Sequence, residues 1–385
     1  MTTQRTVVRR APGKLFLLGE YAVLEPGHAA ILAAINRHVT VAVSSPASTS
    51  PTTSTAPDVV IASDLCQPET QLRWRDGRLA GDTAHDDRRA HTTLIHIISA
   101  VEVMDDLLAE RGLPTPAMRI SITSQLHEAG TKLGLGSSGA VTVATVTAVA
   151  NFCAIRLSNH ARFRLALIAT ARITPHSSGG DLAASVWGGW LAYYAPDRTE
   201  ILKLTRRRGI QETLRASWPD FGLRRLPPPD GLALQVGWTG TPASTTAQTE
   251  SHNLRTWQRS RAHRSFLDHM SWCVRAAMRA FALGDRTRLL HEIRTGRHLL
   301  AQVDAEARLG IFTPQLTALC DAAEAAGAAA KPSGAGGGDC GIALLDSPTP
   351  ADIAHLQTQW TALGVRPLGI HVPPLEPDDP PEQPT

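Results

Sequence analysis

The sequence has few cysteines, and none of them forms a pattern that would hold a metal or a redox dithiol. The five cysteines are far apart and include no C-x-x-C pair, which excludes the common zinc and redox motifs. The fifteen histidines include no H-E-x-x-H sequence, so a zinc hydrolase of that type is excluded as well. We expect reduced, mostly buried thiols.

Long hydrophobic runs are also absent. The longest weakly polar stretch, residues 140–155, is interrupted by threonines and an asparagine and is shorter than the ~20 apolar residues that cross a membrane. Residues 1–10 are polar and basic, without the apolar core of a signal peptide. We therefore expect a cytoplasmic protein with no membrane partner.

Lysine is scarce, because nearly all of the 38 basic residues are arginine. Three of the four lysines, Lys14, Lys132 and Lys331, lie in or beside glycine-rich segments, and the fourth is Lys203. A lysine kept in such a place suits a task that needs a compact ammonium group, such as contact with a phosphate. The formal net charge of +3 is too small to predict nucleic-acid binding, so small phosphorylated ligands are the better prediction.

The length of 385 residues, 43% of them hydrophobic, is enough for two folded domains. The proline-rich segment 226–231 is the strongest internal linker signal. We predict a first domain over 1–230, with a flexible Ser/Thr/Pro-rich loop at 44–57, and a second domain over 231–372. Residues 373–385 are rich in proline and acidic residues and are expected to be a disordered tail.

Apolar periodicity and turn residues predict helices and strands in alternation, as in a mixed α+β protein. Thr313 should cap one helix, with Pro314 in its first turn. The predicted helices are 91–111, 159–173, 264–283, 285–309, 313–326 and one from 349. The predicted strands are 5–10, 39–43, 118–123, 189–194, 232–238, 341–345 and 365–372.

The central glycine-rich segment, Lys132-Leu-Gly-Leu-Gly-Ser-Ser-Gly139, predicts a phosphate site. Glycines let backbone N–H groups approach an anion, and the N-terminus of a following helix carries about half a positive charge. We expect Ser137 to cap this helix. Residues 141–149 could also form a strand, but the apolar stripe that continues to Phe152 favours a helix.

The same segment matches the letters G-x-G-x-x-G, which also occur in dinucleotide-binding proteins and protein kinases. A dinucleotide site needs an acidic residue about 20 positions later, whereas no carboxylate occurs between Glu128 and Asp181. The H-R-D sequence of protein kinases and the Gly-Lys-Ser/Thr of a Walker motif are absent. A dinucleotide-dependent oxidoreductase therefore stays only a distant alternative.

Two more glycine-bearing segments lie near the ends of the chain, at 11–27 and at 331–341. The second has four glycines within 334–338, and each would destabilise a regular element by roughly 0.5–1 kcal/mol, so this density indicates a tight turn or a close backbone approach. Taken together, the three segments predict loops that converge on one phosphorylated ligand.

These three motifs, in this order, resemble those of the GHMP kinases, a family named after galactose, homoserine, mevalonate and phosphomevalonate, and the resemblance covers residues 5–372. It is strongest to the phosphomevalonate kinase branch, on the segments 19–27, 132–139 and 237–245, with Tyr21 where mevalonate kinases usually have histidine. The implied fold is a two-domain α+β fold, with an N-terminal mixed α/β nucleotide-binding domain and a C-terminal ferredoxin-like α+β domain.

The resemblance implies an ATP-dependent phosphotransferase that uses Mg²⁺ to phosphorylate 5-phosphomevalonate, giving 5-diphosphomevalonate and ADP. It further implies small-molecule partners only, no nucleic acid, and a monomer or homodimer. Two alternatives remain: mevalonate kinase or another small-molecule member of the family, and a non-catalytic sensor that keeps the fold.

Site residues are carried over from the family motifs in the same way. Because a phosphate acceptor is already anionic near neutral pH, with a second pKa of about 6, we expect Asp181 to orient Lys14 or the acceptor instead of removing a proton. The implied catalytic residues are Lys14 and Asp181, and the implied metal ligand is Ser138. The implied ATP-binding residues are Lys132, Gly134, Leu135, Gly136, Ser137, Ser138 and Gly139. The implied acceptor-binding residues are Lys14, Glu20, Tyr21, Trp238, Ser244, Thr245, Ser333, Gly334, Ala335 and Gly336.

Overall fold

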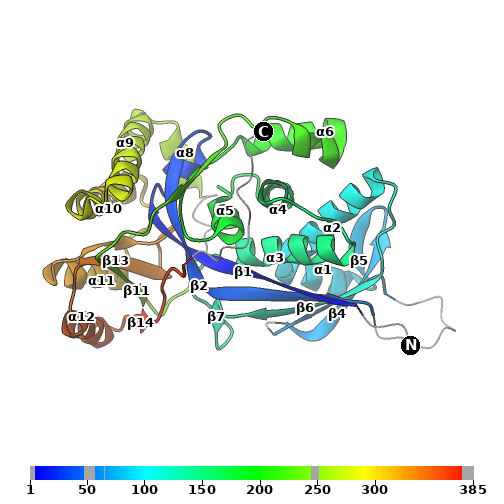
Figure 1. Ribbon diagram of the computed structural model, residues 1–385, viewed down its shortest axis with the longest axis horizontal. Helices are drawn as coiled ribbons and strands as arrows, with labels where there is room; N and C mark the ends of the chain where they lie inside the picture. Colours follow the sequence, from blue (N-terminus) through cyan, green and yellow to red (C-terminus); the bar gives the residue numbers. More distant parts are fainter. Residues whose placement is uncertain (1–4, 47–56, 65, 244–250, 375–385) are drawn as a thin grey trace.

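A computed structural model of the chain describes residues 5–46, 57–64, 66–243 and 251–374. Its strands form two main sheets that lie next to each other (Figure 1). The first half of the chain builds the larger sheet, and the second half builds the smaller one. Most of the described residues predicted for the site line one cleft where the two halves meet.

The larger sheet has the strand order β10-β9-β2-β6-β3-β4-β5, with β1 paired to β2. Only the β3–β6 pair is parallel among the pairings that the structure gives for this sheet. The strands are β1 (Thr6–Leu18), β2 (Ala29–Ser44), β3 (Val59–Ser63), β4 (Cys66–Arg75), β5 (Arg78–Gly81), β6 (Met118–Ser124), β9 (Trp190–Tyr194) and β10 (Gly222–Leu226).

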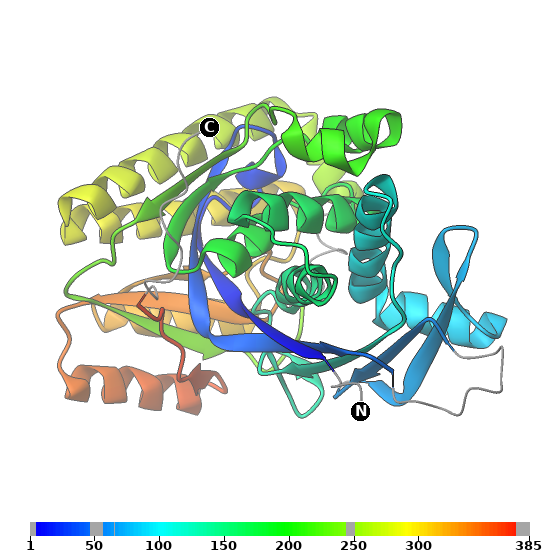
Figure 2. The same ribbon diagram turned by 45° about the vertical axis from the view of Figure 1, so that its right-hand side comes forward.

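Helices gather on one side of this sheet (Figures 1 and 2). The central one is α3 (Ser137–Phe152), which packs on both β1 and β2 and has 12 of its 16 residues buried. A helix buried on every side carries apolar residues all round, which explains why its sequence also resembles a strand. The other helices of this layer are α1 (Ala84–Thr93), α2 (Ile95–Glu110), α4 (Asn159–Ile173), α5 (Gly180–Trp187) and α6 (Arg198–Arg215), and the short η1 (Ala22–Leu24) follows β1.

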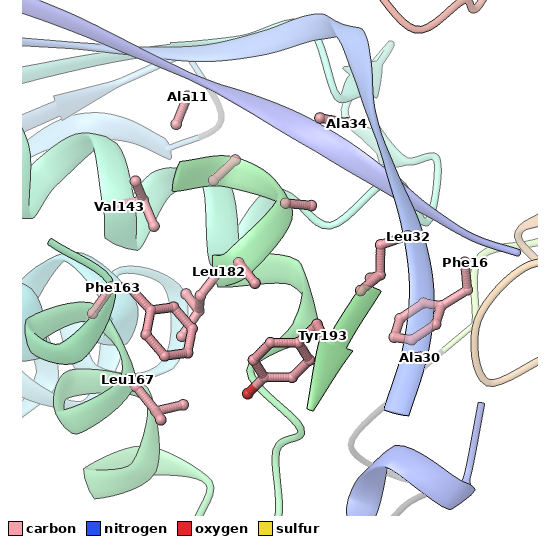
Figure 3. Close-up of a cluster of buried hydrophobic side chains, with 14 of the residues drawn as sticks. Ala11, Phe16, Ala30, Leu32, Ala34, Val143, Phe163, Leu167, Leu182 and Tyr193 are labelled. Carbon is pink, nitrogen blue, oxygen red and sulfur yellow. The ribbon is translucent and has the colours of Figure 1, made fainter. Parts of the chain in front are cut away.

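The core between these helices and the sheet combines branched aliphatic and aromatic side chains (Figure 3). Phe163 and Leu167 of α4 and Leu182 of α5 are fully buried, as is Tyr193 of β9. The Tyr193 hydroxyl donates to the carbonyl of Ser178 at 2.7 Å. Burial of each such side chain contributes about 1.5–3 kcal/mol, and the tyrosine bond fixes the loop that leads into α5.

The smaller sheet is antiparallel, with the order β12-β13-β11-β14. Figure 2 shows α9 and α10 side by side, and the two helices pack against each other. The strands are β11 (Leu232–Trp238), β12 (Ala329–Pro332), β13 (Cys340–Asp346) and β14 (Arg366–Leu368). The helices are α8 (His252–Gln258), α9 (Arg261–Leu283), α10 (Arg286–Ala307), α11 (Pro314–Ala325) and α12 (Pro350–Ala362), and a small hairpin of β7 (His127–Glu128) and β8 (Thr131–Lys132) precedes α3.

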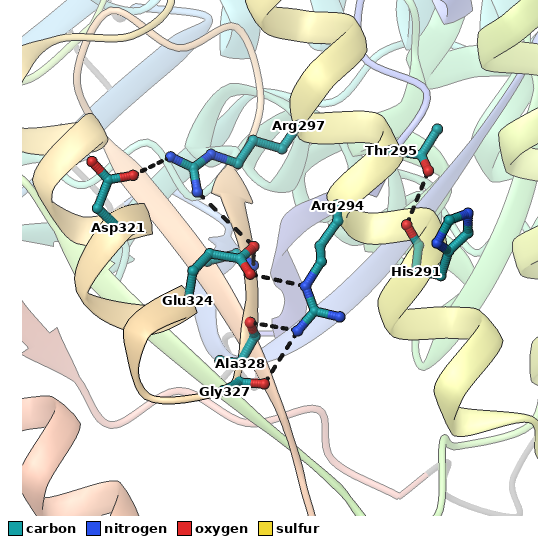
Figure 4. A network of polar contacts seen from close by, with 9 residues as sticks. His291, Arg294, Thr295, Arg297, Asp321, Glu324, Gly327 and Ala328 are labelled. Atoms are coloured by element: carbon teal, nitrogen blue, oxygen red, sulfur yellow. Dashed lines mark hydrogen bonds and ion pairs between the residues drawn. The ribbon is translucent and has the colours of Figure 1, made fainter.

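A set of exposed ion pairs links α10 to α11; we call Arg294, Arg297, Asp321 and Glu324 the surface arginine network (Figure 4). The guanidinium of Arg294 lies 2.8 Å from Glu324 and also donates to the carbonyl of Ala328 at 2.9 Å. Arg297 pairs with both Asp321 and Glu324. The last turn of α11 and the chain that leads into β12 are thereby attached to α10.

Several predictions of local structure are confirmed. The helix over 159–173 is present as predicted, with Ser158 as its cap. Thr313 caps α11, with Pro314 in the first turn. Residues 141–149 are helical. At these positions capping and apolar periodicity, which depend on residues close together in the sequence, agree with the tertiary contacts.

Other predictions are wrong. The helix expected over 91–111 is two helices with a break at Leu94, and the strand expected over 365–372 is confined to 366–368. Ser137 does not cap α3, because Gly136 takes the cap position in a left-handed conformation, φ 81°, and Ser137 is already in the first turn. The strands β3 to β5 and the helix α6 were not predicted.

The larger sheet ends at Leu226 and the smaller one begins at Leu232, so the proline-rich segment between them connects the two sheets. On this ground we propose a domain boundary near residue 230. Of the predicted loop 44–57, residues 47–56 lie outside the described chain, as do residues 375–385 of the predicted tail. Within the described ranges, no helix is long and apolar enough to cross a membrane.

Candidate active site

The three glycine-bearing segments converge on one cleft of about 330 Å³. Its walls come from β1 and η1, the loop before α3, the first turn of α5, and the loop between β12 and β13. Lys14, Asp181, Gly134 and Gly334, which are far apart in the sequence, all line it. The prediction that these segments meet at one site is therefore confirmed.

The β1 strand brings Lys14 into the cleft at an irregularity in its pairing with β2, between Pro12 and Lys14. A Cβ on Gly13 would lie 2.6 Å from the carbonyl oxygen of Leu135, so only glycine lets the central segment come this close. The backbone N–H of Lys14 then donates to that carbonyl at 2.8 Å. The Lys14 side chain is 9% exposed, and its Nζ donates to the carbonyl of Gly134 at 3.3 Å.

The glycines of the central segment make room for side chains from the other segments. A Cβ on Gly134 would lie 2.3 Å from Cβ of Asp339, one on Gly136 would lie 2.7 Å from Cγ of Lys14, and one on Gly139 would lie 2.5 Å from Oδ2 of Asp181. A Cβ atom almost never makes non-bonded contacts shorter than 3.0 Å. Interlocking with the other motifs therefore requires glycine here, in addition to any close approach of a phosphate.

Asp181 lies in the first turn of α5, and its carboxylate packs against Gly139. Burial raises the pKa of Asp181, while the Lys14 ammonium and the backbone amides of Leu182 and Gly139 lower it. In the part of the chain that the structure describes, no direct ion pair joins Asp181 to Lys14. The two side chains line the same cleft and attract each other without forming a direct ion pair.

The N-terminus of α3 opens on the cleft, with Ser137 and Ser138 in its first turn. The first N–H groups of a helix have no partner within the helix, and the helix dipole favours an anion there. Lys132 lies on the same wall and adds positive charge. This arrangement suits a phosphate chain.

Other residues predicted to contact the acceptor lie around this cleft or behind it. Glu20, Tyr21, Gly334 and Ala335 line it. Ser333 does not, since its hydroxyl is bonded to the backbone of Phe16 as acceptor at 2.9 Å and as donor at 3.1 Å.

The remaining predicted residues are not in the cleft wall. Leu135 contributes its carbonyl to Lys14 from a buried position, and Gly336 packs against Ile311. Trp238 lies on β11 beneath the guanidinium of Arg366, 4.9 Å from the ring centre. Ser244 and Thr245 lie outside the described residues, although Ala243 just before them lines the cleft.

Several cleft residues were not predicted from the sequence: His96, Thr170, Thr174, Ser177, Ser178 and Asp339. Two of them lay next to predicted motifs, because Ser177 and Ser178 precede Asp181 and Asp339 follows the last glycine run. Asp339 accepts a hydrogen bond from the N–H of Ala243 at 2.9 Å, and burial raises its pKa. His96 had no local signal; burial, assisted by Lys132, lowers its pKa to about 4.

Hard oxygen ligands for Mg²⁺ are present in the cleft. The described residues contain no group of three or more His, Cys, Asp or Glu side chains able to hold a metal ion by themselves. The Ser138 hydroxyl and the Asp181 carboxylate do line the same space. Mg²⁺ commonly takes one or two such protein ligands and completes its shell with phosphate oxygens and water, so the residues present fit this ion.

Comparison with known proteins identifies the family. The model of the GHMP kinase N-terminal domain matches residues 96–189, and that of the GHMP kinase C-terminal domain matches residues 277–361. A phosphomevalonate kinase from Streptomyces sp. strain CL190 is 56% identical over 377 residues, which is 98% of this chain and 100% of that protein. The chain belongs to the GHMP kinase family. The two-domain fold expected from the motifs is thereby confirmed.

Two further relatives place this GHMP kinase within the family. A structure of Streptococcus pneumoniae phosphomevalonate kinase in complex with phosphomevalonate and AMPPNP superimposes with a TM-score of 0.80 at 25% identity, covering 95% of this chain and 99% of that one. A mevalonate kinase from Thermococcus onnurineus strain NA1 is 27% identical over 94% of this chain and 95% of its own length. The GHMP kinase is thus far more similar to the Streptomyces phosphomevalonate kinase than to this mevalonate kinase.

Proposed function

We propose that this GHMP kinase is a phosphomevalonate kinase. It transfers the γ-phosphoryl group of ATP to the phosphate of 5-phosphomevalonate, giving 5-diphosphomevalonate and ADP, in the mevalonate route to isopentenyl diphosphate. The observation that carries the proposal is the single cleft in which Lys14, Asp181 and the N-terminus of α3 meet. The 56% identity with a phosphomevalonate kinase over almost the whole chain supports the choice of acceptor.

In this proposal the first turn of α3 and the glycine-rich segment before it hold the nucleotide phosphates. Backbone N–H groups and Lys132 supply the positive field. Catalysis of phosphoryl transfer depends mainly on positioning the groups and on neutralising negative charge. The glycines at 134, 136 and 139 have two functions. They expose the backbone to phosphate, and they leave room for Lys14 and Asp181 in the same cleft.

Lys14 supplies the ammonium group at the transferring phosphoryl. A bond forms between an acceptor phosphate oxygen and the γ-phosphorus, while the bond from that phosphorus to the bridging oxygen of ADP breaks. Negative charge then develops on the oxygen that leaves with ADP. A nearly buried ammonium stabilises this charge more than an exposed one would, because less water screens it.

Asp181 orients Lys14 and the acceptor and takes no proton, since the acceptor phosphate is already anionic at neutral pH. Its position beside Gly139, in the cleft that Lys14 also lines, suits this role. We expect Asp181→Asn to lower kcat while the pH–rate profile keeps both ionisation limbs. Disappearance of one limb in that profile would show that Asp181 is a base.

Mg²⁺ would be held by the Ser138 hydroxyl, with the Asp181 carboxylate lining the same cleft. When bound, the ion neutralises charge on the nucleotide phosphates. Glu20, Tyr21, Gly334 and Ala335 would contact the acceptor from the other side. We keep Trp238, Ser244 and Thr245 in the proposal as residues of the segment that borders the cleft at Ala243.

The test is an acceptor assay. Purified protein is given ATP and Mg²⁺ with either mevalonate or phosphomevalonate, and release of ADP is followed. We expect kcat/KM for phosphomevalonate to exceed that for mevalonate by about 10²-fold or more, because a site built for a charged group rejects an analogue that lacks it. The reverse preference would make the protein a mevalonate kinase.

Binding without turnover would instead identify a sensor, so the same samples are examined for acceptor binding by calorimetry. Tight binding of phosphomevalonate with no ADP released over hours would contradict the proposed activity. Because the reaction consumes ATP, we also propose that the protein works in the cytoplasm, where ATP is regenerated.

A further inference from the structure

Lys331 is fully buried, with 0% of its side chain exposed. Its Nζ pairs with Oε1 of Glu20 and donates to the carbonyl of Pro332 at 2.6 Å. Glu20 is itself 3% exposed. A charged pair withdrawn from water in this way is costly unless it is well bonded, so its presence beside the cleft needs an explanation.

The pair belongs to a larger set of contacts between residues 16–21 and residues 331–335, which we call the clasp. The Gly334 N–H also donates to Oε1 of Glu20, at 3.4 Å, and the Tyr21 hydroxyl donates to the carbonyl of Ala335 at 2.6 Å. Both polar backbone atoms of Phe16 are bonded to the Ser333 hydroxyl. The clasp therefore joins the end of β1 to the third glycine segment, residues that are more than 300 positions apart.

The clasp determines what faces Lys14. A Cβ on Gly334 would lie 3.7 Å from the Lys14 ammonium, so the third segment passes close to the reacting end of that side chain. The second carboxylate oxygen of Glu20, Oε2, is buried and has no hydrogen-bond partner among the described residues. Glu20 lines the cleft, so one of its oxygens is fixed by Lys331 while the hydrogen-bonding capacity of the other is unused.

The described residues packed around Lys331 leave its side chain little room to move and no second carboxylate to pair with. Leu18 packs directly on Gly296 of α10, because a Cβ on Gly296 would lie only 2.3 Å from the Leu18 side chain. The same Cβ would lie 4.0 Å from Cδ of Lys331, so α10 also packs closely on the lysine. Another buried carboxylate in the region, Glu292, is paired with Arg288 at 2.6 Å. Glu20 is accordingly the carboxylate that Lys331 holds.

We propose that Lys331 is a positioning residue for the acceptor: through Glu20 it holds Gly334 and Ala335 against Lys14 and keeps Glu20 Oε2 directed to the ligand. This inference rests on the proposed function for the identity of the acceptor. It gives Lys331 a role in turnover that a merely structural ion pair would not have. The role concerns the acceptor more than ATP, because the nucleotide phosphates are assigned to the N-terminus of α3.

The test is a double-mutant cycle on kcat/KM for phosphomevalonate, using Lys331→Met, Glu20→Gln and the double variant. If Lys331 acts through Glu20, Lys331→Met lowers kcat/KM for the acceptor by about tenfold or more in the wild-type background and by less than about threefold in the Glu20→Gln background. KM for ATP should stay within about twofold. Arg297→Gln, which breaks two partly exposed ion pairs between α10 and α11, is the matched control and should change neither constant.

Equal losses from Lys331→Met in both backgrounds would overturn the proposal, as would equal rises in KM for ATP and for the acceptor. If Lys331→Met does not fold, Glu20→Asp decides the matter: it keeps the charge pair but moves the carboxylate, and it should raise KM for the acceptor by about tenfold without changing KM for ATP. An unchanged acceptor KM would reject the positioning role. If the wild-type enzyme prefers mevalonate, the cycle is run with mevalonate, so failure of the assigned acceptor and failure of the clasp remain distinguishable.

Discussion

Two groups of ion pairs hold the second half of the chain in place, and they differ mainly in burial. In the clasp, Lys331 and Glu20 are both almost fully removed from water. In the surface arginine network, Arg294, Arg297, Asp321 and Glu324 keep between 22% and 63% of their side chains exposed. The same chemistry therefore has different consequences at the two places: loss of one partner leaves an unpaired buried charge in the clasp, whereas water replaces the lost partner in the network.

The comparison extends to the lysines. Lys14 and Lys331 are buried at the junction of the two halves, whereas Lys203 is exposed on α6 and pairs with Glu200. Buried ammonium groups are expensive to keep, and both of these lie at the cleft or directly behind it. The buried lysines are thus the ones whose removal should affect the enzyme most.

The largest expected effect is on turnover. Lys14→Met should lower kcat by about 10³-fold or more, because the charge at the transferring phosphoryl is lost. The fold should survive, since Lys14 makes no ion pair among the described residues. Steady-state kinetics with phosphomevalonate measure the loss, and Lys203→Met is the matched control. Retention of wild-type kcat in Lys14→Met would reject the assigned site.

The next effect is on stability. Lys331→Met should lower the free energy of unfolding by about 3–5 kcal/mol, because Glu20 is left charged, buried and without its cation. Urea denaturation followed by tryptophan fluorescence measures this. The double variant with Glu20→Gln should recover part of the loss. A drop below about 1 kcal/mol in the single variant would mean that water reaches Glu20.

The pH dependence of stability should reveal His96. Burial lowers its folded-state pKa to about 4, below the ordinary value of 6.5. Between these two values the unfolded chain binds the additional proton, so His96 makes the protein less stable as the pH falls through this window. His96→Asn should remove about 1–3 kcal/mol of the stability lost between pH 7 and pH 4. Denaturation at several pH values, with exposed His298→Asn as control, checks this; parallel curves for wild type and His96→Asn would contradict it.

The smallest effect is expected in the surface arginine network. Arg297→Gln should cost at most about 1 kcal/mol, because both of its ion pairs are partly solvated and screened by salt. The difference from wild type should shrink further in 1 M salt. A loss comparable to that of Lys331→Met would mean that burial does not separate the two groups.

Much of the local structure could be predicted from residues close together in the sequence. Thr313 and Pro314 begin a helix because capping needs only a side chain and the next turn. The break at Leu94 was not predicted, nor were the strands β3 to β5, whose place in the larger sheet depends on the pairing of β3 with the more distant β6. The wrong assignment of Ser137 as a cap has a similar cause, since Gly136 adopts φ 81° where Lys14 from β1 occupies the place of a side chain.

The residues of the site also fall into two groups, those that could be predicted from the sequence and those that could not. The three glycine segments, the lysine at position 14 and the carboxylate at position 181 could be identified without a structure, because close backbone approach and phosphate chemistry restrict which residues can stand there. The packing of Asp339 on Gly134, the position of His96 in the cleft and the pairing of Lys331 with Glu20 could be found only from the three-dimensional arrangement of the chain. Such contacts join residues as much as 311 positions apart, and their energies depend on burial, which no short stretch of sequence specifies.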